Sequence, residues 1–146
     1  MNHHLTVVEF KRFSENANIP HKATSDAAGI DLYSAENISV PPCGGKGIVS
    51  TDIGIKLPSG TCGIIMSRSG LCINNSVTVF SGLIDRDYTG PIKLVIFNHG
   101  NREFHVNRNM RLAQLVIHKV VDPMLIETKD LGQTERGNNG FGSTGV

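Results

Sequence analysis

Residues 41–66 read PPCGGKGIVSTDIGIKLPSGTCGIIM, and this stretch decides the fold class. Three short runs rich in valine and isoleucine are separated by turn signals: a Pro-Pro-Cys-Gly-Gly cluster at the start and Pro58-Ser59-Gly60 in the middle. β-Branched residues favour strands, whereas proline and glycine favour turns. Many short strands with regular turn signals are typical of an all-β sandwich or barrel.

The same pattern continues on both sides of this stretch, and helical periodicity is scarce. His99-Gly100-Asn101 is a further turn signal, and the one helix we expect is a short turn after Ser69. The expected strands are Leu5–Phe13, Ile30–Tyr33, Lys46–Asp52, Gly54–Leu57, Gly63–Met66, Val77–Phe80, Ile92–Phe97, Glu103–Val106 and Leu112–Val121.

Length and composition limit the class of protein. A chain of 146 residues suits one domain with a real core. A net charge of +1 gives no global field that would favour nucleic acid or an anionic membrane, and no apolar run approaches a membrane span. The N-terminus lacks a charged-then-apolar signal pattern. We expect a single domain at residues 1–133 followed by a mobile arm at 134–146.

Cysteine usage indicates the compartment. The chain has three cysteines, an odd number, and no C-x-x-C pair. A disulfide framework or a zinc site is therefore not expected, and a reducing intracellular setting, cytoplasmic or nuclear, fits best.

The glycine-rich tail contains a G-x-G-x-x-G at residues 140–145. In a dinucleotide-binding fold this motif needs a strand before it and a helix after it, and the sequence offers neither. Arg136, Ser143 and Thr144 nevertheless supply donors suited to a triphosphate, and the Phe141 ring is able to stack on a flat base. The same composition also fits a disordered terminus.

The stretch SRSGL, residues 67–71, has the composition of an anion-binding turn. Arg68 offers a fixed fork of donors, Ser69 adds a hydroxyl, and Gly70 lets backbone N–H groups approach an anion closely. A helix beginning here would add a favourable dipole. Taken alone, the stretch is better explained as a capped turn with a solvated arginine.

The stretch GLIDRDYTG, residues 82–90, predicts a hairpin with a carboxylate and an aromatic ring at its mouth. An aspartate near a phosphate is able to orient and deprotonate a water, and this gives Asp85 a candidate role. The Tyr88 ring is able to stack under a sugar. An aspartate-rich turn with a packed tyrosine is the alternative.

Two further stretches carry polar residues on expected strands. In AAGIDLYS, residues 27–34, Asp31 lies among apolar neighbours, and a buried carboxylate is costly unless it is paired or near a metal. Mg²⁺ prefers carboxylate and phosphate oxygens. Asp31 alternatively lies on the solvent face of an edge strand, with Ile30 and Leu32 facing the core. In RLAQLVIHK, residues 111–119, Gln114 either reaches a ligand or belongs to a packed strand.

Together and in this order, these stretches resemble the five motifs of the homotrimeric dUTPase family. AGIDLYS resembles the first motif, RSGL the second, GLIDRDYTG the third, RLAQLVI the fourth and RGNNGFGSTG, residues 136–145, the fifth. The resemblance runs from about Ala23 to the end of the chain. It implies a jelly-roll-like β-barrel, a homotrimer with active sites at subunit interfaces, and Mg²⁺-assisted hydrolysis of dUTP to dUMP and pyrophosphate. That reaction limits uracil in DNA and supplies dUMP for thymidylate synthesis.

The resemblance also implies roles for individual residues. By motif position, Asp85 would activate the water that attacks the α-phosphorus, and Tyr88 would lie against the deoxyribose and disfavour a 2′-hydroxyl. Asp31 would contact Mg²⁺ through water, while backbone groups around Gly82 and Lys93 would pair with uracil. Phosphates would be held by Arg68, Ser69, Gly70 and Gln114, and the tail would close with Arg136, Phe141, Gly142, Ser143 and Thr144.

Two other hypotheses remain open at this point. A dCTP deaminase has a related fold and overlapping phosphate motifs, but the Asp-x-Asp-Tyr pattern of residues 85–88 favours dUTP hydrolysis. A non-catalytic binding or signalling protein on the same fold rests on departures from the third and fourth motifs. One of these is Phe80, which either narrows the uracil pocket or points into the core.

Overall fold

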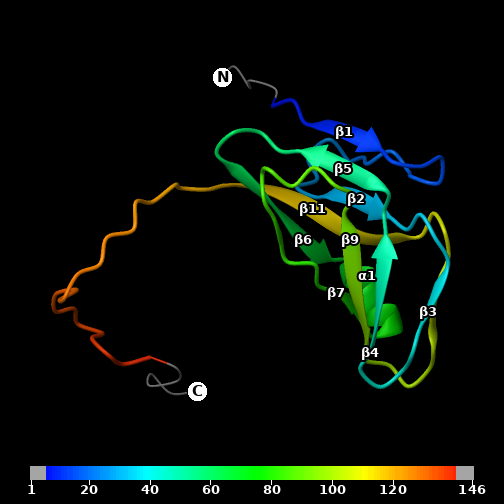
Figure 1. Cartoon of the computed structure of the whole chain (residues 1–146). Helices are drawn as coiled ribbons and strands as arrows, with labels where there is room; N and C mark the ends of the chain where they lie inside the picture. Colours follow the sequence, from blue (N-terminus) through cyan, green and yellow to red (C-terminus); the bar gives the residue numbers. More distant parts are fainter. Residues whose placement is uncertain (1–5, 141–146) are drawn as a thin grey trace.

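The computed structural model describes residues 6–140 and consists almost entirely of β-strands (Figure 1). The expected all-β class is confirmed, as is the short helix after Arg68, α1 (Ser69–Asn75). The strands are β1 (Glu9–Arg12), β2 (Ile30–Tyr33), β3 (Ile38–Val40), β4 (Gly45–Ser50), β5 (Ile53–Lys56), β6 (Thr61–Ser67), β7 (Val77–Val79), β8 (Leu83–Ile84), β9 (Lys93–Asn98), β10 (Phe104–Val106) and β11 (Arg111–Lys119).

Strand pairing follows a nested pattern. β2 pairs with β11, β3 with β10 and β4 with β9, as in one long hairpin whose two arms run antiparallel. The remaining pairs complete a four-stranded sheet β2-β11-β6-β8, a three-stranded sheet β4-β9-β7 and a β1-β5 ribbon. Wrapping such a hairpin into a barrel gives the expected jelly-roll-like fold.

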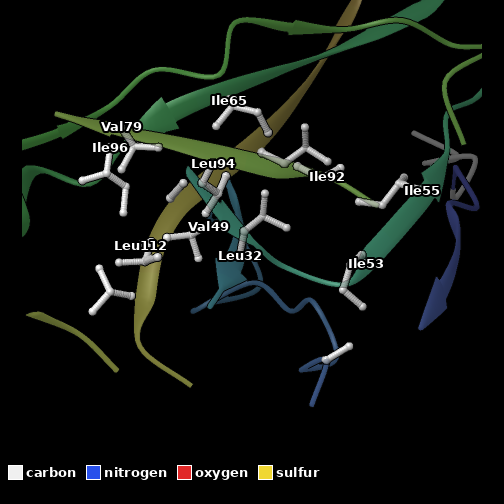
Figure 2. Packing of buried hydrophobic residues seen from close by; sticks show 14 of the residues in the cluster. Leu32, Val49, Ile53, Ile55, Ile65, Val79, Ile92, Leu94, Ile96 and Leu112 are labelled. Carbon is white, nitrogen blue, oxygen red and sulfur yellow. The ribbon is translucent and has the colours of Figure 1, made fainter. Parts of the chain in front are cut away.

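The core lies between these sheets (Figure 2). Along β9 every second residue is buried, so that Leu94 and Ile96 are fully enclosed, and Val49 of β4 meets them from the paired strand. Leu32 and Leu112 close the core from the four-stranded sheet. Burial of each such side chain stabilises the folded state by about 1.5–3 kcal/mol relative to an exposed position. This alternation is therefore the main determinant of the register in which the strands pair.

One strand, β3, was not expected from the sequence, and β8 was expected only as an arm of the hairpin at residues 82–90 but pairs with β6. β3 has three residues and β8 has two, which is too short for alternation to be recognisable. The expected strand at residues 112–121 ends at Lys119, and the one at residues 5–13 covers Glu9–Arg12, with Leu5 outside the described residues.

The chain leaves the barrel after β11 (Figure 1). Val120 still donates its N–H to the Gly60 carbonyl at 3.0 Å, but residues 120–140 contain no strand or helix and are exposed throughout. The division of the chain at residue 133 stays a prediction. The three cysteines are free thiols, and in the described part of the chain no helix has the length and apolarity to cross a membrane.

Candidate active site

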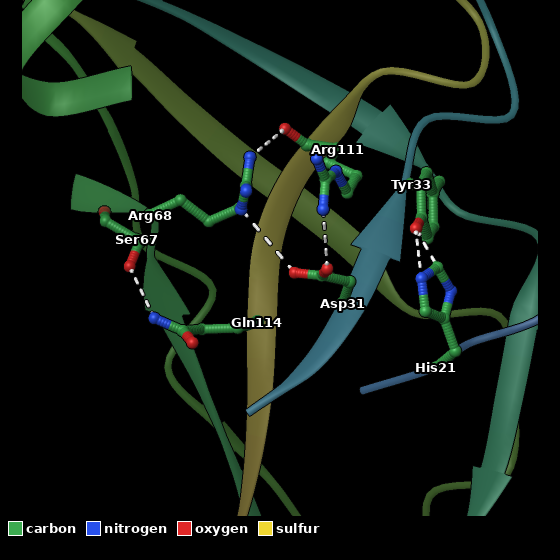
Figure 3. Close-up of polar contacts among 7 residues, drawn as sticks. All are labelled: His21, Asp31, Tyr33, Ser67, Arg68, Arg111 and Gln114. Carbon is green, nitrogen blue, oxygen red and sulfur yellow. Dashed lines mark hydrogen bonds and ion pairs between the residues drawn. The ribbon is translucent and has the colours of Figure 1, made fainter. Parts of the chain in front are cut away.

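A buried carboxylate with two cations lies at one end of the four-stranded sheet (Figure 3). The Asp31 side chain is only 9 % exposed. Its Oδ1 lies 3.5 Å from Nε of Arg68, and its Oδ2 accepts a hydrogen bond from Nη1 of Arg111 at 3.3 Å. This pairing compensates the burial of the charge.

Strand register explains why these groups meet. β11 lies between β2 and β6, and Gln114 is the partner of Asp31 on one side and of Met66 on the other. Paired residues share a face of the sheet, and this face is opposite to the one that buries Leu32 and Leu115. Asp31 therefore lies away from the core, as the solvent-face alternative predicted, yet it is buried beneath arginines.

Gln114 is held in a fixed position beside this carboxylate. Its Nε2 donates to the Ser67 carbonyl at 3.2 Å. A Cβ at Gly29 would lie 2.3 Å from Oε1 of Gln114, so only glycine leaves room for the amide there. The Gln114 side chain thus reaches the Ser67–Arg68 segment rather than the core.

The segment after β6 presents Arg68, Ser69 and Gly70 at the start of α1. Arg68 has extended backbone angles and its carbonyl accepts the N–H groups of Leu71 and Cys72 at 3.1 and 3.3 Å. Ser69 and Gly70 are exposed, and a Cβ at Gly70 would meet nothing within 4 Å. Packing within this chain therefore does not require a glycine at residue 70.

Three residues near Asp31 were missed as site residues. Arg111 supplies the second cation, and its own carbonyl accepts from Arg68 Nη1 at 3.3 Å. Tyr33 stacks with His21, and its hydroxyl lies 3.2 Å from the His21 Nδ1 (Figure 3). Burial raises the pKa of the Tyr33 hydroxyl, Asp31 raises it further, and Arg111 and Arg68 oppose the shift. Arg111 had a signal in its place in RLAQLVI and Tyr33 in its place in AGIDLYS, whereas His21 lies outside these stretches.

Asp85 belongs to a second group of residues, at the other end of β6. β8 pairs Leu83 with Ile64 and Ile84 with Gly63, so the following residue, Asp85, lies near the start of β6. Asp85 is exposed in a cleft of about 770 Å³. The cleft is lined by Ser59, Gly60, Thr61, Cys62, Leu83, Asp85, Arg86, Asp87, Val120, Val121 and Asp122.

The two groups are separated along one strand. Asp85 lies beside Cys62, while Arg68 follows the last residue of β6. At about 3.3 Å per residue, the stretch from Cys62 to Arg68 spans roughly 20 Å. The structure thus brings together Asp31, Arg68 and Gln114, and places Asp85 apart from them.

Gly82 and Lys93 lie on facing segments. Gly82 has a φ of 72°, a left-handed conformation that favours glycine, and its carbonyl accepts from Ile65 N–H at 3.0 Å. The Ile92 carbonyl accepts the Thr51 N–H on the β4 side of β9. Because the backbone groups of successive residues in a strand point to opposite edges, those of Lys93 point to the other edge, toward residues 80–82.

That segment is fastened to β9 by two hydrogen bonds. The Phe80 N–H donates to the Val95 carbonyl at 2.8 Å, and the Val95 N–H donates to the Ser81 hydroxyl at 3.0 Å. Phe80 is 69 % exposed, so the alternative that it points into the core is wrong.

Tyr88 closes the turn that begins at Asp85. Its N–H donates to the Asp85 carbonyl at 3.1 Å, and its hydroxyl donates to the Pro91 carbonyl at 2.9 Å. The ring is half exposed and packs on the Cα of Gly90. The turn therefore presents one face of the ring outward.

The remaining predicted residues lie in the tail. Arg136 is exposed, and its carbonyl accepts the Asn139 N–H at 2.9 Å. Phe141, Gly142, Ser143 and Thr144 lie outside the described residues. Among residues 6–140 no three His, Cys, Asp or Glu side chains are grouped so that they could hold a metal ion.

Comparison with known proteins places this geometry in a family context. A family model described as dUTPase matches residues 15–145. The deoxyuridine 5′-triphosphate nucleotidohydrolase of Saccharomyces cerevisiae is 44 % identical, over 95 % of this chain and 95 % of its own length. That of Solanum lycopersicum is 48 % identical, over 93 % of this chain and 80 % of its own length.

Solved structures agree with the sequence relatives. The dUTPase of Staphylococcus bacteriophage 80alpha, solved with dUPNHPP, superimposes with a TM-score of 0.89 at 28 % identity, covering 97 % of this chain and all of the phage chain. A mutant dUTPase from phage phi11 of S. aureus gives a TM-score of 0.80 at 25 % identity, over 86 % of this chain and 99 % of the other. That structure describes the coordination of a structural Mg(II) ion.

Proposed function

Because the chain belongs to the dUTPase family and is a dUTP-hydrolysing enzyme, we propose that the two groups of residues at opposite ends of β6 are complementary parts of its catalytic site. The reaction is hydrolysis of dUTP to dUMP and pyrophosphate. One observation carries the proposal. A donor-rich cluster suited to phosphate lies at one end of the strand, and an exposed aspartate suited to activating water lies at the other.

The triphosphate binds at the cluster around Arg68. The Arg68 guanidinium is held by Asp31 and by the Arg111 carbonyl, so it is preorganised for a phosphate oxygen. Ser69 and the open backbone at Gly70 add donors from the same exposed turn. Gln114 keeps its amide beside Ser67 and completes the phosphate site.

Asp85 activates the nucleophile. Its carboxylate takes a proton from a water whose oxygen bonds to the α-phosphorus, while the bond from that phosphorus to the α–β bridging oxygen breaks and pyrophosphate leaves. The exposure of Asp85 in the cleft supports this role, because the carboxylate is not committed to an ion pair within the described residues.

Uracil and deoxyribose are recognised by the segments beside Asp85. The backbone of Lys93 and the left-handed turn at Gly82 face each other across an open strand edge, which suits pairing with the edge of uracil. The outward face of the Tyr88 ring lies against the sugar and disfavours a 2′-hydroxyl.

Mg²⁺ would be held mainly by the substrate phosphates, with Asp31 as its contact from the protein. It neutralises charge on the triphosphate when bound, and it usually retains several waters and takes only one or two protein carboxylates. The oxygens of Asp31 are already shared between Arg68 and Arg111, so this carboxylate fits a contact through water better than direct ligation.

A complete site needs more than one copy of the chain. Asp85 and Arg68 of one chain are about 20 Å apart along β6. A water held by Asp85 therefore cannot contact a phosphate held by Arg68 of the same chain. In a homotrimer Asp85 of one subunit would meet the phosphate cluster of another.

The segment that follows β11, residues 120–133, is suited to a partner subunit. Its side chains at residues 121, 124, 125, 126 and 131 are apolar and between 78 and 92 % exposed, and such a run is stabilised by burial against another surface. The residues beyond it, Arg136 and Phe141 to Thr144, would then close over a bound nucleotide and exclude water.

The experiment is an Asp85→Asn substitution, which keeps the side-chain volume and removes the base. We expect pyrophosphate release from dUTP to fall by about 100-fold or more. Calorimetry with a non-hydrolysable α,β-imido dUTP should show binding retained.

Asp122→Asn is the matched control, because Asp122 lines the same cleft and loses the same charge. It should remain close to wild type. An active Asp85→Asn enzyme would remove Asp85 from this role. Pyrophosphate release from dUTP, dCTP, dTTP and UTP, with and without Mg²⁺, together with ammonia release from dCTP, tests the substrate and the metal.

A further inference from the structure

We propose that Gly54 and Phe13 are positioning residues. They fix the position of the Tyr88 ring relative to the bound sugar and thereby set the preference for deoxyribose over ribose. They act through the backbone of Thr89 and Gly90, which lies between them and the ring. The inference rests on the proposed role of Tyr88.

Gly54 packs directly against the turn that carries Tyr88. It lies in β5, where a Cβ would be 2.5 Å from the Thr89 carbonyl oxygen and 3.2 Å from that of Gly90. Both neighbours are backbone atoms, so they cannot escape by a change of rotamer. The bare Cα of Gly54 therefore allows this close approach of the turn to β5.

Gly90 transmits that position to the tyrosine. A Cβ at Gly90 would lie 3.0 Å from the Tyr88 hydroxyl oxygen and 3.1 Å from Cζ, which shows that the ring packs directly on this glycine. The hydroxyl is tied to the Pro91 carbonyl at 2.9 Å. The ring therefore moves with the backbone of residues 89–91.

Phe13 lies beside the turn on the same face of Gly54. Its Cε2 would lie 2.7 Å from a Cβ at Gly54, and its N–H donates to the Asp52 carbonyl at 2.9 Å. The Lys11 ammonium lies 4.9 Å from the centre of the ring. The aromatic ring is thus fixed at the edge of an open cleft of about 540 Å³, which also reaches Thr89 and Gly90.

These contacts form one continuous series, in which Phe13 and the backbone of residues 89–90 pack on Gly54, and the Tyr88 ring packs on Gly90. A methyl group at Gly54 has to push the Thr89 carbonyl from 2.5 Å out to an ordinary contact of 3.4 Å, a displacement of about 0.9 Å. The Tyr88 ring would be displaced by a similar distance from its contact with the sugar. A misplacement of about 1 Å is enough to cost up to about 100-fold in rate.

The test measures kcat/KM for dUTP and for UTP in wild type, Gly54→Ala and Gly54→Ala/Phe13→Leu. Gly54→Ala should lower the ratio of dUTP to UTP by about tenfold, because dUTP uses the Tyr88 contact and UTP does not. The second substitution vacates space beside the new methyl group and should recover part of the ratio.

Gly47→Ala is the matched control for a purely structural effect. A Cβ at Gly47 would be 2.8 Å from the Ile38 side chain, but Gly47 lies in β4, remote from the turn. This variant should lose thermal stability and keep its substrate ratio. A Gly54→Ala ratio within about twofold of wild type would overturn the inference.

Two further variants separate this inference from the function on which it rests. If Gly54→Ala does not fold, Phe13→Ala replaces it, since Phe13 is half exposed, and an unchanged ratio again contradicts the proposal. A wild type without preference for dUTP, or a Tyr88→Ala variant that keeps the preference, contradicts the proposed role of Tyr88. Loss of preference in Tyr88→Ala but not in Gly54→Ala contradicts only the positioning role.

Discussion

Asp52 joins three segments through one side chain and its own backbone. Its carboxylate accepts hydrogen bonds from the hydroxyls of Ser14, at 2.5 Å, and Ser50, and its φ of 52° is one that aspartate tolerates better than most residues. These bonds, that from Ser14 first, lower the pKa of the Asp52 carboxyl. The segment after β1, which includes Phe13, is thereby fastened to the turn between β4 and β5.

The lowered pKa predicts an acid-sensitive contribution to stability. Because the folded-state pKa lies below the unfolded value of about 3.9, the contribution is complete above that value and is lost as pH falls through the folded pKa. Asp52→Asn should therefore lower the free energy of unfolding by about 1 kcal/mol or less near neutral pH and by progressively less below pH 4. Urea unfolding from pH 7 to pH 3 measures this, and a difference independent of pH would contradict it.

At the scale of secondary structure, the four-stranded sheet owes its polar end to three adjacent strands. β2 contributes the carboxylate, β11 contributes Arg111 and Gln114, and the segment after β6 contributes Arg68. Each of these segments alone presents only one or two polar side chains. Their pairing converts these side chains into a shared cluster in which a buried charge is neutralised.

Removing one cation of this cluster should destabilise the sheet. Arg111→Ala leaves the buried Asp31 with Arg68 alone, and we expect a loss of about 1–3 kcal/mol in the free energy of unfolding, read from urea titrations. Arg108→Ala is the control, because Arg108 is exposed and donates to the neutral Asn16 side chain at 2.9 Å. It should cost roughly 0.5 kcal/mol or less. Equal losses in the two variants would show that the ion pair contributes nothing specific.

The sequence was most informative where strands alternate over several residues. β9 shows this alternation and was predicted within a residue at each end, whereas β8 is too short to show any. For the site, the residue types of Asp31, Arg68 and Gln114 were readable. Their meeting depends on which strands pair, β2 with β11 and β11 with β6, and the pattern within one strand does not specify its partner. For the same reason Tyr33 and His21 were missed.

For the molecule as a whole, the separation of Asp85 from Arg68 makes a prediction about assembly. Asp85→Ala and Arg68→Ala should each be nearly inactive. When the two variants are unfolded together and refolded as a mixture, the site shared between an intact Asp85 and an intact Arg68 of different subunits should restore a measurable fraction of dUTP hydrolysis.

The control for this experiment is each variant refolded alone at the same total concentration, which should stay inactive. Light scattering on the refolded mixture reports the number of subunits. Recovery of activity is expected only if the two groups come from different chains. A fully refolded, oligomeric mixture without activity would place both groups in one subunit.

The nested pairing of strands also affects the order in which the strand pairs form during folding. The β4–β9 ladder closes the shortest loop of the series, and the β3–β10 and β2–β11 ladders close progressively longer ones. Loop entropy therefore favours zipping from the inside outward, a slow process typical of proteins rich in distant contacts. During synthesis β11 emerges after both of its pairing partners, so β2 lacks its strand partner until β11 is released. The cluster of Asp31, Arg68, Arg111 and Gln114 is then assembled only after β11 has emerged.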